Sequence, residues 1–457
     1  MSSNVLEPLG NSTFRRLYAA QVLALFGTGL TTVALALLAY DLAGGKAGTV
    51  LATALTIKML TYVVIGPVAG ALTSHVPRKQ LLVTLTLVRA GIIILLPFVT
   101  AVWQIYLLVF TLQAASALFT PTFQATIPDI VRDEKAYTKA LSLSRLAYDL
   151  ENLLSPALAA ALLLVATFHW LFLGTVIGFV TAALLIALTR VPDAVTEQAD
   201  TGIRRRSMLG LRIFARTPRL RGLLALNMAV AAGGAMALVN TVVYVRDRLG
   251  LGETEVALAM TALGAGSMIV ALTLPGLLQH VRERPTMIAG AILISGALVA
   301  GLVSPGFHLL LGLWFLLGVG SSLILTPTGR LLRRSARDDD RPTVFAAQFS
   351  LSHACWLVTY PLAGWLGFYL GLNAVFAVLS VFAAVAAMVA WRLWPREDPV
   401  EIEHFHDDLR ADHPHVADAV ADGHGFRHTH PFAIDELHCR WPLGWSGRVG
   451  ETNGNNH

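Results

Sequence analysis

The chain has 457 residues, of which 55% are hydrophobic and only 14% are charged. A soluble domain has about a quarter of its residues charged, so this composition excludes an ordinary soluble domain and indicates a membrane protein. Two cysteines exclude a disulfide framework. The net charge of +5 does not indicate nucleic-acid binding, because it is uneven: residues 396–457 hold twelve Asp and Glu against five Arg.

Twelve apolar stretches, most of them about twenty residues or longer, follow one another along the chain, which predicts an all-α polytopic membrane protein. The first follows Arg15 and Arg16 and runs for roughly 25 residues, which is too long for the core of a signal peptide, so we expect it to be retained as a span. The predicted spans are 17–42, 47–72, 81–100, 103–127, 138–166, 168–190, 221–246, 253–279, 286–304, 307–330, 343–369 and 372–394.

Basic residues are concentrated in alternate loops. One set of loops contains Arg78, Arg132, the run Arg204–Arg206, Arg282 and Arg333, whereas the other set contains few positive charges. Since positively charged loops stay on the cytoplasmic side, we expect both termini to be cytoplasmic. This orientation, with no cleavable leader expected, predicts a multi-pass membrane protein.

The two halves of the chain repeat. The motif "FTPT" at 119–122 matches "LTPT" at 325–328, and at the same offset of 206 residues Gln21 matches Asn227. The sequence therefore predicts two six-helix bundles, at 1–190 and 221–394, with a linker at 191–220 and a polar tail at 395–457. Repeats of this kind are typical of transporters that rock around a site between the bundles.

Ionisable residues inside the predicted spans are costly and indicate function. In the fifth span Arg145 lies one helical turn before Asp149, so these two residues can neutralise each other. Glu151 lies about 200° around the helix from Asp149 and is the freer acid. We expect Glu151 or Asp149 to exchange protons or cations, the alternative being a structural ion pair.

Three further polar residues lie within spans. Lys58, in the second span, requires a counter-ion that the sequence does not reveal. His353, in the eleventh span, is either a ligand or proton relay or a histidine hydrogen-bonded within the bundle. Asn227, in the seventh span, is a candidate polar group of the central cavity.

The tail is rich in histidine. Its three His-x-His pairs can each close on one ion in an extended chain, and imidazole suits nickel, cobalt, copper and zinc. We expect weak, fast binding by a flexible segment rather than a closed structural site. The alternatives are a solvated acidic extension and a pH sensor. The candidate ligands are His404, His406, His413, His415, His424, His428, His430 and His438.

The loop "GALTSHVPRK" at 70–79 resembles the loop motif of the major facilitator superfamily, with matches at Gly70, Arg78 and Lys79 but Ser74 in place of the usual Asp. This resemblance covers about residues 14–394 and implies the twelve-helix major facilitator fold, with Gly70, Arg78 and Lys79 in a gating loop. Together with the histidine-rich tail, the chain resembles bacterial nickel-resistance exporters, which neighbour the drug:proton antiporters. A bacterial inner-membrane location is implied only by this resemblance.

The sequence thus predicts a monomeric exporter of divalent transition metal ions, nickel first, by proton antiport, with membrane lipid, metal ions and protons as partners and no cofactor beyond a metal transported or bound by the tail. Expelling a dication against 100 mV costs roughly 4.6 kcal/mol, so about two or more protons must return per ion. The alternatives are a drug or siderophore exporter and a metal-sensing receptor. An enzyme is not expected, because no catalytic motif or Walker-type phosphate loop is present.

Overall fold

The structure is a computed structural model, and it describes most of the chain. The described residues are 6–65, 76–131, 133–192, 202–278, 280–337, 340–398, 401–406, 414–416, 419–422, 425–434, 437–438 and 441. Some side chains within the helices are not described, and Arg145, Asp149 and Asn152 are among them.

Twelve long helices of the described chain correspond one to one to the twelve predicted spans. The first six are α1 (Ser12–Ala43), α2 (Ala47–Ile65), α4 (Arg78–Leu95), α5 (Val102–Ile130), α6 (Glu134–Leu163) and α7 (His169–Ala187). The second six are α9 (Pro218–Val243), α10 (Glu253–Leu277), α11 (Glu283–Ala300), α12 (Phe307–Arg333), α13 (Arg341–Leu370) and α14 (Leu372–Leu393). The all-α fold is confirmed.

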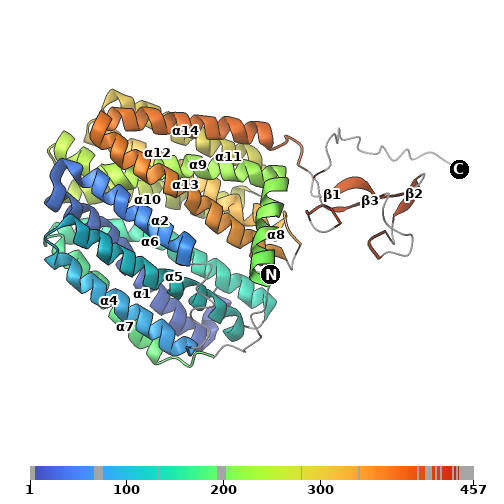
Figure 1. Ribbon diagram of the computed structural model, residues 1–457, viewed down its shortest axis with the longest axis horizontal. Helices are drawn as coiled ribbons and strands as arrows, with labels where there is room; N and C mark the ends of the chain where they lie inside the picture. Colours follow the sequence, from blue (N-terminus) through green and yellow to red (C-terminus); the bar gives the residue numbers. More distant parts are fainter. Residues whose placement is uncertain are drawn as a thin grey trace.

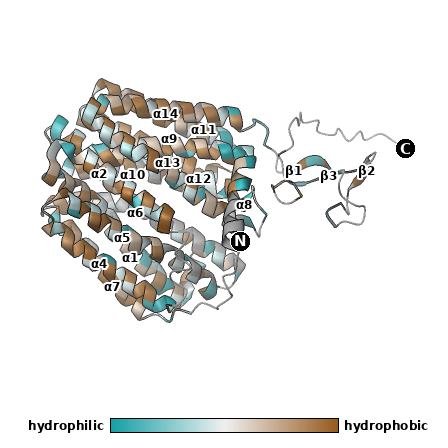
Figure 2. Ribbon diagram, viewed as in Figure 1, coloured by the Kyte–Doolittle hydropathy of each residue, from teal (hydrophilic) through white to brown (hydrophobic). Residues whose placement is uncertain are grey.

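Ten of these twelve helices, all except α6 and α13, lie in stretches long and apolar enough to cross a membrane. Nine stretches of the described chain meet that condition, and the first, Ser12–Ile65, contains two helices. Large apolar side chains such as Leu272 and Val381 are more than half exposed, which a soluble surface rarely tolerates in number. Figure 2 shows apolar residues along most of each long helix and hydrophilic residues at the helix ends.

Each set of six helices packs mainly within itself. In the first set α1 packs on α6 and α7, and α4 packs on α5 and α7; in the second set α12 packs on α10 and α11, and α9 packs on α13 and α14. The two sets meet where α2 packs on α13 and α6 packs on α10. In their sets, α2 and α10 are both the second helix, and α6 and α13 are both the fifth. Each of the two contacts between the bundles therefore joins a second helix to a fifth helix, and the repeat relates one contact to the other.

The linker contains a helix that the sequence analysis did not identify. Helix α8 (Gly202–Arg216) packs on α13, with Gly210 so close to Thr343 that a Cβ there would lie 2.5 Å from the Thr343 carbonyl oxygen. In Figure 1, α8, the N-terminal end and the tail all lie at one end of the bundles. We call this end the tail end and the opposite one the far end.

The tail folds into a small antiparallel sheet. Strand β1 (Glu401–His406) pairs with β3 (Gly425–Pro431), which also pairs with β2 (Val420–Asp422), and a short turn of helix η8 (Pro414–Val416) lies between β1 and β2. Ile402, Val416, Phe432 and Ile434 are buried beneath it. This order differs from the expected flexible segment, because the pairing of β1 with β3 joins residues 20 to 30 positions apart.

Candidate functional site

A group of three ionisable residues lies between the bundles. Lys58 of α2 is within electrostatic reach of Glu151 of α6 and His353 of α13, and we call these residues the central trio. At 1.5 Å per residue, Lys58 lies about 16 Å and Glu151 about 18 Å from the far ends of their helices. Glu151 is therefore an oppositely charged neighbour of Lys58 that the sequence could not reveal.

Close packing against α1 positions Glu151. A Cβ added to Gly29 of α1 would lie 2.2 Å from the Cβ of Ser155 and 3.4 Å from the Cγ of Glu151. Only a glycine therefore lets α6 approach α1 along the face that carries Ser155 and Glu151. Glu151 keeps some accessible surface although protein surrounds it, as expected for a side chain that borders an internal space.

His353 is held by its own helix and by α2. Its Nδ1 donates a hydrogen bond to the Phe349 carbonyl at 2.7 Å, which leaves Nε2 as the acceptor. Its ring centroid lies 4.0 Å from that of Phe349 and 5.9 Å from that of Tyr62. Tyr62 lies one turn from Lys58 on α2, so the imidazole and the ammonium group face the same seam between the bundles.

The other predicted membrane residues have varied surroundings. Asn227 is 3% exposed, and its Nδ2 has no hydrogen-bond partner within the described part of the chain. Its repeat mate Gln21 accepts a hydrogen bond from Ser144 at 3.4 Å. The side chains of Asp149 and Arg145 lie outside the described residues, so their predicted ion pair stays a prediction.

The chemistry of the central trio favours proton exchange over resting metal binding. Glu151 offers one carboxylate and His353 one imidazole, but the Lys58 ammonium competes with any other cation for Glu151. A dication entering this group would meet a positive charge in a low-dielectric setting, where like-charge repulsion is strong. Entry of such a cation therefore requires Lys58 to move away or to lose its proton.

Ion pairs with reversed polarity close the tail end of each bundle. Arg78, at the start of α4, pairs with Asp129 of α5. Glu283, at the start of α11, pairs with Arg334, just after α12, at 3.3 Å. The two pairs are offset by 205 residues at both positions, one residue less than the offset of the repeated motifs. They join helices of the same order in each set, with the charges exchanged. Gly70 lies outside the described residues. Lys79 is described, but its role in a gating loop stays a prediction.

Small residues bring the bundles together at the far end. A Cβ added to Gly364 of α13 would lie 2.2 Å from the Cβ of Ala52 and 2.6 Å from the Gly48 carbonyl oxygen of α2. Tyr40 of α1 donates a hydrogen bond to Asp247, which lies in a π-helical turn (Tyr244–Arg248) after α9. The α2–α13 seam is thus closed at this end by direct backbone approach.

The sequence analysis did not single out Arg89. This residue of α4 is only 6% exposed, and its guanidinium lies 4.1 Å from the Phe119 ring centroid and 4.9 Å from that of Phe179. An arginine inside a predicted span was a readable signal. Its stacking between α5 and α7 fits a packing role within the first bundle.

The tail histidines gather on one face of the sheet. In the register of β1 and β3, His404 is paired with His428, and Ile402 is paired with His430. Since alternate residues of a strand point to the same side, His404, His406, His428 and His430 share a face. His415 of η8 and His438 close over this face.

Five of these imidazoles form a compact cage. One nitrogen from each of His404, His406, His415, His428 and His438 lies within 4.8 Å of all the others, and we call these residues the tail cage. The Nε2 of His404 lies 3.0 Å from that of His428 and 2.9 Å from that of His438. The Nε2 atoms of His415 and His438 are 3.2 Å apart.

These separations fit ligands of a single ion. Imidazole nitrogens about 2.0–2.1 Å from one metal lie about 3.0 Å apart at a right angle and about 3.4 Å apart at a tetrahedral angle. His404 also donates from Nδ1 to the Ile402 carbonyl at 2.9 Å, which directs the Nε2 lone pair into the cage. This second hydrogen bond is typical of metal-binding histidines.

The electrostatics of the tail cage keep its imidazoles in the ligand form. Loss of solvent contact, reinforced by the neighbouring imidazoles, lowers the pKa of His404 and of His415 to about 4. The same causes lower the pKa of His428. Neutral imidazole is the form that binds metals, so these side chains are ready to bind at neutral pH.

The cage differs in one respect from the expected site. The sequence analysis expected separate His-x-His pairs on a flexible chain, whereas the structure brings histidines from β1, η8, β3 and residue 438 together. His430 borders the group, with its ring centroid 4.7 Å from that of His404. His413 and His424 lie outside the described residues, and their predicted roles stay predictions.

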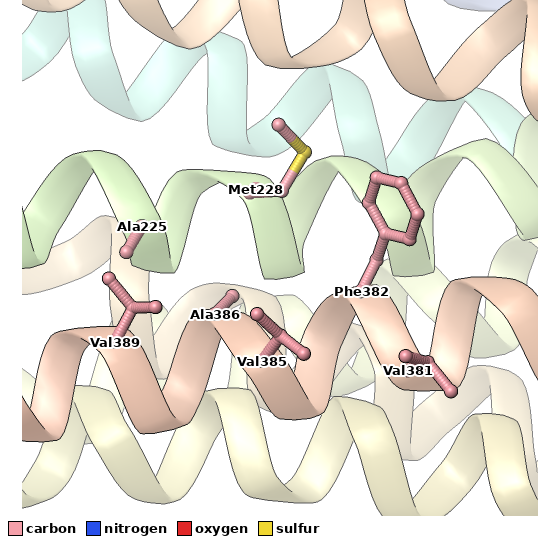
Figure 3. Close-up of a pocket in the computed structure, with 7 residues that line it drawn as sticks. All are labelled: Ala225, Met228, Val381, Phe382, Val385, Ala386 and Val389. Carbon is pink, nitrogen blue, oxygen red and sulfur yellow. The ribbon is translucent and has the colours of Figure 1, made fainter.

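An apolar groove of about 340 Å³ lies between α9 and α14. Figure 3 shows that the lining residues come from two helices: Ala225 and Met228 from α9, and three valines, Ala386 and Phe382 from α14. Val381 and Val385 at its rim are about half exposed, so the groove opens on the apolar outer surface. It lies apart from the central trio and offers no polar group to a metal ion.

Comparisons with known proteins agree with this fold. The chain is 24% identical over 345 residues to YfiS of Bacillus subtilis (strain 168), an uncharacterized MFS-type transporter, covering 72% of this chain and 81% of that one. It is 24% identical over 293 residues to macrolide efflux protein A of Streptococcus pyogenes, covering 62% and 71%.

Among solved structures, the nucleoside transporter NupG matches with a TM-score of 0.66 and 12% identity, covering 84% of this chain and all of that one. The sequence profile of the Major Facilitator Superfamily matches residues 17–252 and 224–411, which together include both sets of six helices and the start of the tail. The chain is therefore a transporter-type membrane protein that belongs to the major facilitator superfamily.

Proposed function

We propose that this protein exports a divalent transition-metal ion, with nickel as the first candidate, in exchange for protons across a bacterial inner membrane. The observation that carries the proposal is the tail cage, in which five imidazole nitrogens lie within 4.8 Å of one another. A cage of neutral nitrogen donors suits nickel, cobalt, copper and zinc and disfavours magnesium and calcium. The tail end is cytoplasmic in this proposal, so the cage meets ions on the side from which they leave.

The central trio supplies the proton exchange. Lys58 neutralises Glu151 in the absence of cargo, and a proton or a cation replaces that interaction during the cycle. Two protons or more must enter for each dication, because expelling two charges against 100 mV costs roughly 4.6 kcal/mol. Glu151, Asp149 and His353 are the groups proposed to bind them or the cargo.

A second candidate is export of an amphipathic drug, with the tail binding metal for a regulatory purpose. The similarity to macrolide efflux protein A favours this candidate. The positive charge of Lys58 beside Glu151 also favours it, since that charge opposes a dication at the centre.

Growth of an efflux-deficient bacterial host on graded nickel, cobalt, zinc and macrolides separates the two candidates. We expect expression of the chain to raise nickel tolerance, Glu151→Gln to abolish the gain, and deletion of residues 401–441 to reduce it. Glu397→Gln, which changes an exposed carboxylate, is the matched control and should behave as the wild type. Unchanged nickel tolerance beside raised macrolide tolerance would replace the first candidate by the second.

A further inference from the structure

The tail cage is connected to the bundle by a continuous series of ring contacts. Phe432 is 3% exposed, and its ring centroid lies 5.1 Å from that of His404 and 4.8 Å from that of His438. On its other side, its centroid lies 5.2 Å from that of Trp441. Any change in how the cage histidines are held therefore reaches Trp441 through one buried ring.

Trp441 in turn contacts the start of α9. The Arg219 guanidinium carbon lies 5.0 Å from the Trp441 ring centroid, at cation–π distance. Arg219 is only 1% exposed. A charge buried to this extent depends on its neighbours, and Trp441 is the neighbour that follows the histidine-bearing sheet.

Arg219 is the centre of an ion-pair network at the tail end of the second bundle. Its guanidinium donates to Asp398 at 3.0 Å, to the Ser335 hydroxyl at 2.8 Å and to the Arg334 carbonyl at 2.9 Å. Arg334 pairs with both Asp398 and Glu283. The network thus joins α9, α11, the end of α12 and the segment after α14 at the tail end of the second bundle.

A bound ion would stiffen this connection. In the free cage, nitrogens about 3 Å apart can share only a proton between each pair. One metal ion bonds all of them at once and links β1, η8, β3 and residue 438, which are otherwise joined by stretches of chain. The ordering that this bonding provides extends to Phe432 and Trp441, because both follow directly on the cage.

We propose that one divalent transition-metal ion, held by His404, His415, His428 and His438, presses Trp441 against Arg219 and so controls the rigidity of the tail-end network. The tail is then a metal-responsive regulatory element as well as a collector of ions. This inference rests on the tail site of the proposed function, but it does not require that the cargo be a metal.

Hydrogen–deuterium exchange of the full-length protein in nanodiscs, with saturating nickel or with a chelator, tests the proposal. We expect one nickel ion per chain and at least about tenfold slower exchange at residues 217–224 with nickel, within the roughly 100-fold limit set by ligand at 100 times its Kd. Residues 401–406 and 425–434 should slow in parallel. No bound nickel, or bound nickel with unchanged exchange at 217–224, would overturn it.

Two variants separate binding from transmission. Trp441→Leu should still bind one nickel ion and protect the strands, but should lose the protection at 217–224. His404→Ala with His428→Ala should lose both, whereas His308→Ala, which removes an exposed imidazole far from the tail, should match the wild type. Wild-type protection at 217–224 in Trp441→Leu would contradict the route through Trp441. Bound nickel with unchanged exchange at 217–224 would overturn this inference alone, whereas absence of bound nickel would also remove the observation that carries the proposed function. Failed nickel transport leaves this result intact, because no transport is measured here.

Discussion

The tail cage and the central trio handle charge in opposite ways. The cage gathers five imidazole nitrogens with no ammonium group among them, whereas the trio sets one carboxylate and one imidazole beside the charge of Lys58. In the proposed function, the first arrangement holds a metal ion and the second exchanges charges. The comparison suggests that capture and transport are divided between two sites, so each can be altered separately.

The largest effect should come from the carboxylate of the trio. Glu151→Gln keeps the shape of the side chain but can no longer bind and release a proton, so we expect proton-driven transport to fall by about 100-fold or more. Nickel binding by the tail should not change. Transport assays on vesicles, with calorimetric nickel titration of the same sample, measure both, and a parallel loss of tail binding would show that the two sites are not separate.

The second effect should come from the cage. Removing two of its ligands, as in His404→Ala with His428→Ala, should lower the nickel affinity of the protein by about 10- to 100-fold, the range found even for supporting residues of metal sites. Transport at saturating nickel should change far less than transport at low nickel. Equal loss at every concentration would place the cage on the transport path itself.

A third effect concerns the closure of the bundles at the far end. Gly364→Leu places a side chain where even a Cβ lies 2.2 Å from Ala52, and overpacking of this kind costs about 1–3 kcal/mol. We expect about tenfold slower transport with unchanged tail binding. Gly296→Leu, at a glycine with no atom within 4 Å of its Cβ position, is the matched control, and equal loss in both variants would point to a general folding defect.

The smallest effect should come from the ion pairs with exchanged polarity. Arg78→Asp places a second carboxylate beside that of Asp129, so the ion pair is replaced by repulsion. Because partly exposed ion pairs contribute about 0.2–1 kcal/mol, we expect transport to slow by about two- to fivefold. Arg78→Asp with Asp129→Arg should restore the rate, because it installs the polarity of Glu283 and Arg334. Failure of the double variant to recover would show that the arginine has a role besides pairing.

The membrane helices could be predicted because hydrocarbon thickness fixes their length and composition. Helix α8 was missed because it is a polar helix in the linker, outside any apolar stretch. The repeat also contained the ion-pair equivalence: Arg78 and Asp129 correspond to Glu283 and Arg334 at an offset of 205, but only coordinates show that the members of each pair meet.

The sites were only partly predictable for a related reason. Lys58 and Glu151 stand out as charges within spans, yet their proximity depends on how all the helices of the bundles are arranged. The histidines of the tail are visible as a composition, but the pairing of His404 with His428 depends on strand register. The sequence states which residue types are present, but the distances between the cage nitrogens depend on how distant parts of the chain pair.

Sealed vesicles that contain only the purified protein provide the most direct test of the central claim. With an inward proton gradient imposed across the membrane, we expect nickel to move in the opposite direction, and this movement should stop in Glu151→Gln and when the gradient is collapsed. Nickel that stays in place in the wild-type vesicles, while a macrolide moves under the same gradient, would contradict metal export by this protein.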